Sequence, residues 1–209
     1  MIGVVASGGS EVGGATARPG VDLLWIPLGA GSAVPVVRCN GRMYEALVAR
    51  RERRERLDLY HAALEVGVDG ARFVVEMTPA WGSGHSAEGV VVSGPVGLRV
   101  LGRSRLFRYE VHCRRGGVIP DRDHAVGGPR VLTSDEGVAR RVLDLAPTFP
   151  TAVWGRDELG AGEMWNSNSL VAWLLASAGL PARDLTPPPN GRAPGWAAGL
   201  AVAAAPTRT

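Results

Sequence analysis

The chain has 209 residues, of which 45% are hydrophobic and 21% are charged, and its formal net charge is +3. This length and composition fit one globular domain with a buried core. All 23 basic residues are arginines, as in GC-rich coding sequences, and they are scattered among 20 acidic residues. We therefore expect no nucleic-acid partner, and no apolar run approaches the ~20 residues that a membrane-spanning helix needs.

The two cysteines, Cys39 and Cys113, form neither a disulfide framework nor a CxxC metal pair. Residues 1–20 are rich in glycine and lack the charged region and apolar core of a signal peptide. We expect a cytoplasmic protein with reduced thiols and no cofactor. The candidate metal ligands His85, His112, Cys113 and His124 have no recognised ligand spacing, so no metal is expected.

The pattern of apolar and turn residues predicts a flexible leader, one folded domain and a tail, at 1–20, 21–186 and 187–209. Within the domain, alternating apolar residues predict strands at 21–27, 33–38, 89–93 and 105–112. A helix is expected at 43–56. The tail is expected to be turn-rich and then alanine-rich.

A β-hairpin is the clearest local prediction. Two alternating runs, 59–66 and 72–77, flank Asp69-Gly70, a pair typical of a tight hairpin turn. If pairing is symmetric about this turn, the numbers of opposite residues sum to 139. One face then carries only apolar side chains, namely Ala62, Leu64, Val66, Phe73, Val75 and Met77. His61 and Glu76 fall on the other face, one diagonal step apart.

Two helices are predicted in the second half of the chain. Thr133 and Glu136 have capping-box spacing, which predicts a helix from there to about Leu145, ended by Pro147. A second helix begins at Glu163 or Ser167 and ends at Ser177. Its apolar stripe is Leu170, Val171, Leu174, Leu175 and Ala178. Strands followed by helices indicate an α+β fold, with a small antiparallel sheet packed against helices.

His61, Glu76 and the segment Asn166-Ser167-Asn168-Ser169 together resemble the circularly permuted papain-like superfamily, which includes NlpC-type and lecithin:retinol acyltransferase-like enzymes. In those enzymes an early strand carries the general-base histidine and the adjoining strand carries its polar partner. The nucleophilic cysteine begins a late, buried helix. Ser167 stands in the position of that cysteine.

The resemblance implies that Ser167 attacks an amide, thioester or ester, with His61 as general base and Glu76 orienting it. Asn166 or Asn168 would help to hold the oxyanion, and Trp165 would wall the substrate pocket. A helix N-terminus lowers the pKa of a thiol, but it cannot by itself ionise a hydroxyl. Ser167 therefore needs His61 within hydrogen-bond reach.

Two functions remain open at this point. The first is a hydrolase or acyltransferase with a small-molecule, peptide or acyl substrate. The second is a catalytically inactive papain-like domain that binds a ligand or another protein. Capping alone also explains Asn-Ser-Asn-Ser before an apolar stripe. Cys39 is an alternative nucleophile, although Asn40-Gly41 after it is more typical of a hairpin turn.

Overall fold

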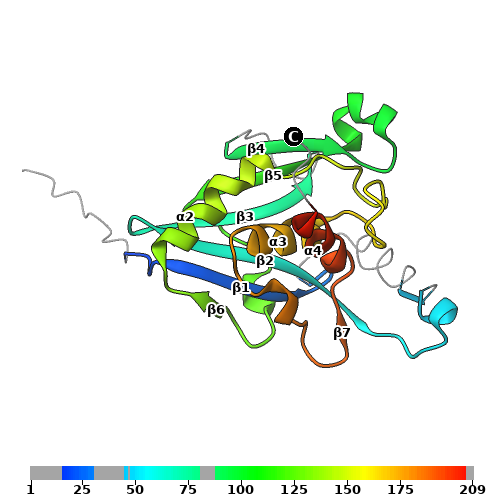
Figure 1. Ribbon diagram of the computed structural model, residues 1–209, viewed down its shortest axis with the longest axis horizontal. Helices are drawn as coiled ribbons and strands as arrows, with labels where there is room; N and C mark the ends of the chain where they lie inside the picture. Colours follow the sequence, from blue (N-terminus) through cyan, green and yellow to red (C-terminus); the bar gives the residue numbers. More distant parts are fainter. Residues whose placement is uncertain (1–15, 31–44, 47, 81–87, 206–209) are drawn as a thin grey trace, which may run out of the picture.

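The computed structural model describes residues 16–30, 45–46, 48–80 and 88–205. Its centre is one sheet with the strand order β4-β5-β3-β2-β1-β6 (Figure 1). These neighbours pair antiparallel, while β7 pairs parallel with β2 off this path. The strands are β1 (Gly20–Pro27), β2 (Asp58–Val68), β3 (Ala71–Pro79), β4 (Val90–Pro95), β5 (Arg108–Arg115), β6 (Arg130–Thr133) and β7 (Gly191–Arg192).

Helices packed on the sheet make an α+β fold, which confirms the predicted class. The helices are α2 (Glu136–Leu145), α3 (Ser167–Ser177) and α4 (Trp196–Ala204). Short 3-10 helices are η1 (Arg99–Arg103), η2 (Arg105–Phe107), η3 (Arg122–His124), η4 (Ala146–Thr148) and η5 (Ala182–Asp184). Residues 45, 46 and 48–52, within the predicted helix at 43–56, are helical as well. The strand predicted at 33–38 lies outside the described residues.

The main core lies between α3 and one face of the sheet. Leu170, Leu174 and Leu175 of α3 are fully buried there, against β2 residues that include Leu64 and Val66. Burying each such side chain stabilises the fold by roughly 1.5–3 kcal/mol. Helices α2 and α4 contribute to the same core, so α2, α3 and α4 cover one face of the sheet (Figure 1).

The hairpin of β2 and β3 has the predicted register. Its pairs run from Leu64↔Val75 to Val68↔Ala71, and the numbers in each pair sum to 139. The turn is tight because Asp69 and Gly70 both adopt positive φ, 50° and 69°, as a type I′ turn requires. Helix α2 fixes this turn from outside: Arg140 donates to the Asp69 carboxylate at 2.8 Å. The backbone N–H of Asp69 donates to Glu136 at 2.9 Å.

Helix α2 begins later than the sequence predicted. Its N-cap is Asp135, whose carboxylate accepts hydrogen bonds from the N–H groups of Gly137 and Val138. Thr133 is the last residue of β6, and its hydroxyl accepts from the N–H of Asp135 instead. Aspartate is as good a cap as threonine, so the strand could extend to Thr133 without loss. The predicted end at Leu145 is confirmed.

The segment after residue 186, predicted as a tail, folds onto the domain through β7 and α4. Gly199 makes this packing possible: a Cβ there would lie 2.3 Å from the backbone oxygen of Ser169 on α3. The Trp196 ring lies 5.0 Å from that of Trp25. The alanine-rich composition predicted for this tail is also the best helix-forming composition.

Within the described residues, no helix has the length and apolar content needed to cross a bilayer.

Candidate functional site

The N-terminus of α3 is built by a capping box. The Asn166 side-chain oxygen accepts from the N–H groups of Asn168 and Ser169, at 2.9 and 3.3 Å. In return, the N–H of Asn166 donates to the Ser169 hydroxyl at 3.1 Å. The Asn166 amide nitrogen donates to the Pro194 carbonyl at 2.8 Å. Both ends of the Asn166 side chain are therefore engaged in holding the helix start, away from any oxyanion role.

Asn168 is a clamp between α3 and the sheet. Its side chain is 3% exposed. Its oxygen accepts from the backbone N–H of Ala62 at 2.7 Å. Its nitrogen donates to the carbonyls of Tyr60 and Pro194 at 3.0 and 2.9 Å. These three bonds fasten the start of α3 to β2 and to the loop before α4. Asn168 is thus also occupied by the fold.

Ser167 is the first residue of α3 and is half-buried. It lies at the positive end of the helix dipole, as the sequence predicted. No hydrogen bond from another described residue reaches its hydroxyl. Trp165 is a core residue, 1% exposed and stacked on Phe149 with ring centroids 4.9 Å apart. It packs the interior instead of walling an open pocket.

His61 lies on the opposite face of the sheet from Ser167. The even-numbered residues Tyr60 to Val68 of β2 pack with α3 in the main core. Ala63 instead packs on the second face, with Leu24, Ile26, Val74 and Ile119. Side chains alternate along a strand, so His61 shares the face of Ala63. The backbone of β2 separates the imidazole from the Ser167 hydroxyl, and the structure does not bring the predicted pair together.

The environment of His61 also differs from that of a general base held by Glu76. Burial lowers the pKa of His61, and the negative charge of Asp121 partly opposes this. Glu76 lies on the same face, as predicted, but its partner is Arg114, at 3.2 Å. Burial raises the pKa of Glu76 and Arg114 opposes the rise. Among the described residues no hydrogen bond or ion pair joins His61 to Glu76.

The structure gathers a different set of polar residues on the second face, here named the polar cluster. Its members come from β3 and β5 and are Glu76, Thr78, Glu110, His112 and Arg114. Cross-strand pairing places Glu76 opposite His112 and Thr78 opposite Glu110. The sequence predicted a strand at 105–112, but gave no signal that this strand lies beside β3.

His112 is the most unusual member of the polar cluster. It is 0% exposed, and neither ring nitrogen has a hydrogen-bond partner in the described part of the chain. Its Nε2 lies 3.5 Å from the Glu110 carboxylate. The Glu88 carbonyl is near the ring but outside hydrogen-bond geometry. Burial lowers the pKa of His112, Arg114 lowers it further, and Glu110 opposes both. The balance therefore favours the neutral imidazole.

The polar cluster does not reproduce a Ser-His-Glu arrangement, because its hydroxyl belongs to Thr78. That oxygen is buried and has no hydrogen-bond partner among the residues that the structure describes. No group of three or more His, Cys, Asp or Glu residues in the described ranges is placed to hold a metal ion. Cys113, which lies within these ranges, is partly buried, and burial raises the pKa of its thiol. Cys39 and His85 lie outside the described residues.

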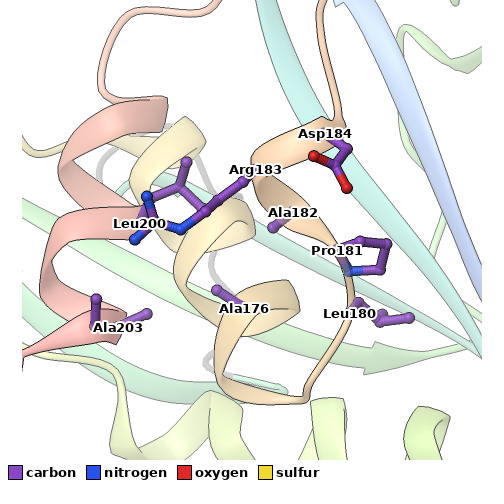
Figure 2. Close-up of a pocket in the computed structure, with 9 residues that line it drawn as sticks. Ala176, Leu180, Pro181, Ala182, Arg183, Asp184, Leu200 and Ala203 are labelled. Atoms are coloured by element: carbon purple, nitrogen blue, oxygen red, sulfur yellow. The ribbon is translucent and has the colours of Figure 1, made fainter.

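A pocket of about 350 Å³ lies at the far end of α3 from Ser167 (Figure 2). It is lined by Ala176, Leu180, Pro181, Ala182, Arg183, Asp184, Leu200, Ala203 and Ala204. An α-helix rises about 1.5 Å per residue, so the length of α3 separates this pocket from the predicted nucleophile by roughly 15 Å. The pocket therefore cannot serve as the substrate site for Ser167.

Comparison with protein-family models, curated proteins and solved structures found no match.

Proposed function

We propose that this chain is a binding module without hydrolase or acyltransferase activity. The observation that carries the proposal is the separation of Ser167 and His61 by the backbone of β2. A serine hydroxyl needs a base within hydrogen-bond reach before it attacks a carbonyl. Without that contact, Ser167 remains a half-buried residue at a helix start.

The roles of the neighbouring asparagines support the same proposal. A side-chain amide that stabilises a developing oxyanion must have its N–H group free to donate to it. The side-chain amides of Asn166 and Asn168 are instead hydrogen-bonded within the capping box, to β2 and to the loop before α4. Capping α3 and fastening it to β2 is then sufficient to explain the segment Asn-Ser-Asn-Ser.

A fluorophosphonate probe tests the proposal, because it labels serines that are activated for attack. Intact protein is incubated with the probe and its peptides are examined by mass spectrometry, alongside Ser167→Ala and His61→Gln variants. We expect no adduct on Ser167. We also expect hydrolysis of p-nitrophenyl acetate and of an acyl thioester to be equal in wild type and Ser167→Ala. An adduct on Ser167 that disappears in His61→Gln would overturn the proposal and restore the hydrolase hypothesis.

A further inference from the structure

The connection between β4 and β5 forms a projecting arm, defined as residues 96–107 and containing η1 and η2. It extends beyond the end of the sheet (Figure 1). Nine large hydrophobic residues of the described chain are exposed, and five of them lie on this arm. They are Leu98, Val100, Leu101, Leu106 and Phe107. Val100 and Leu106 are 67% and 66% exposed. Such clustering of apolar surface marks an interaction site.

The arm is also positively charged. Residues 89–109 contain four arginines, Arg99, Arg103, Arg105 and Arg108, and no acidic residue. Arg99 is neutralised by Glu158, which accepts its two hydrogen bonds at 2.8 and 2.6 Å. Arg103 and Arg105 are exposed and form no ion pair with other described residues. The apolar side chains are thus accompanied by two uncompensated positive charges.

The arm keeps its own backbone hydrogen-bonded. The N–H groups of Leu101, Ser104 and Phe107 donate to the carbonyls three residues earlier, at 3.1, 2.9 and 3.0 Å. At the base, Gly97 donates to the Trp154 carbonyl at 3.0 Å, and Arg156 donates to the Gly97 carbonyl at 2.9 Å. The exposed side chains are therefore presented by an ordered structure. Backbone groups that are already paired can leave water at low cost.

We propose that this arm docks the protein on a membrane surface that contains anionic lipids. Val100 and Leu106 enter the boundary between headgroups and acyl chains, while Arg103 and Arg105 contact lipid phosphates. A projecting apolar end suits a fluid surface, which closes around it, better than a protein partner, which would need a matching groove. The inference goes beyond the proposed function, since lipid docking does not depend on the chemistry of Ser167.

Vesicle co-sedimentation tests the inference. Wild-type protein is mixed with vesicles of phosphatidylcholine alone, or of phosphatidylcholine and phosphatidylserine at about 7:3, an anionic composition that attracts exposed arginines. We expect sedimentation with the anionic vesicles and much less with the neutral ones. The double substitution Val100→Glu, Leu106→Glu should lower the partition coefficient by at least about tenfold, since it removes apolar insertion and adds negative charge. Raising the salt concentration should weaken binding, because surface charges are screened.

The matched control is Val118→Glu with Val131→Glu, which makes the same chemical change at exposed positions outside the arm. This control should bind vesicles far more strongly than the arm variant. Circular dichroism establishes that each variant folds. If the glutamate pair does not fold, Arg103→Gln with Arg105→Gln makes the same test, with an expected loss of about fivefold per arginine.

Three results would overturn the inference. The first is no sedimentation of wild type with either vesicle. The second is an equal loss in the control and arm variants. The third is binding to heparin, or self-association in sedimentation velocity, that depends on the arm but is not accompanied by vesicle binding. Fluorophosphonate labelling is independent of all three, so failure of the lipid inference and failure of the proposed function are distinguishable.

Discussion

Two sites on opposite faces of the sheet hold buried polar side chains in different ways. On the α3 face, the buried amides of Asn166 and Asn168 find partners for both ends. On the second face, His112 is equally buried and has no hydrogen-bond partner among the described residues. The first arrangement fixes a helix to a strand, and the second buries an imidazole of lowered pKa beside two carboxylates.

This difference shows how one step along a strand decides what a residue can do. Ala62 and His61 are neighbours in sequence. The N–H of Ala62 donates to Asn168, whereas the His61 side chain lies on the opposite face of the sheet from α3. The sequence resemblance predicted that His61 lies beside Ser167, at the start of α3. The alternation of side chains places it away from α3 in space. The account is therefore tested by perturbing each face separately.

The largest effect is expected from Asn168→Ala. The substitution removes three buried hydrogen bonds and leaves the Ala62 N–H and the Tyr60 carbonyl without this partner. Because each unsatisfied buried group costs about 1–3 kcal/mol, the free energy of unfolding should fall by roughly 2–5 kcal/mol. Urea denaturation followed by circular dichroism measures it. Ser167→Ala, one residue away, is the control and should change stability by no more than about 0.5 kcal/mol. Equal effects would show that Asn168 is not a clamp.

On the second face, Glu65→Ala should have a smaller effect. Glu65 is 7% exposed and accepts two hydrogen bonds from Arg122, at 2.6 and 3.1 Å. These bonds tie η3 to the sheet. Loss of a buried, charged hydrogen-bond pair should cost about 1.5–3 kcal/mol. Glu52→Ala breaks a contact of the same length, 2.6 Å to Arg54, but at an exposed carboxylate. Glu52→Ala should lower the free energy of unfolding by less than about 1 kcal/mol. A larger loss than for Glu65→Ala would contradict the greater contribution assigned to the buried Glu65–Arg122 pair.

The polar cluster predicts a dependence of stability on pH. The pKa of His112 is lowered in the folded chain. Below the ordinary value of 6.5, this imidazole therefore binds a proton more readily in the unfolded chain than in the folded one. The free energy of unfolding should therefore fall as the pH drops below 6.5. His61 is shifted in the same direction and adds to the loss.

His112→Gln should make this acid-side slope shallower, because the substituted residue does not titrate. Denaturant unfolding at a series of pH values between 7 and 5 measures the slope. His124→Gln serves as the matched control, since His124 is exposed, and it should leave the slope close to that of wild type. If His112→Gln leaves the slope unchanged, folding does not lower the pKa of His112.

The elements that sequence predicted well are those fixed by neighbouring residues. Asp69-Gly70 determines a two-residue turn, and the alternation of apolar residues then determines the hairpin register. The start of α3 follows from a good cap before an apolar stripe. In the same way, the shared face of His61 and Glu76 follows from the register alone.

The features that sequence did not predict depend on contacts between distant segments. The position of β5 beside β3 brings His112 to Glu76, and no local pattern encodes that neighbour. The packing of α4 on α3 depends on Gly199, which in the sequence resembles any other glycine of an alanine-rich segment. The side of the sheet that α3 covers decides whether Ser167 meets His61, and only the assembled core fixes that side.

The most direct test of the separation between Ser167 and His61 is the thiol pKa in Ser167→Cys, measured with and without His61→Gln. Alkylation rates by iodoacetamide at a series of pH values give this pKa, and peptide mass spectrometry distinguishes the introduced thiol from Cys39 and Cys113. The helix N-terminus lowers the pKa in both backgrounds. We predict the same pKa with and without His61. A pKa that rises when His61 is replaced would show an imidazole in contact with position 167, and would contradict the account.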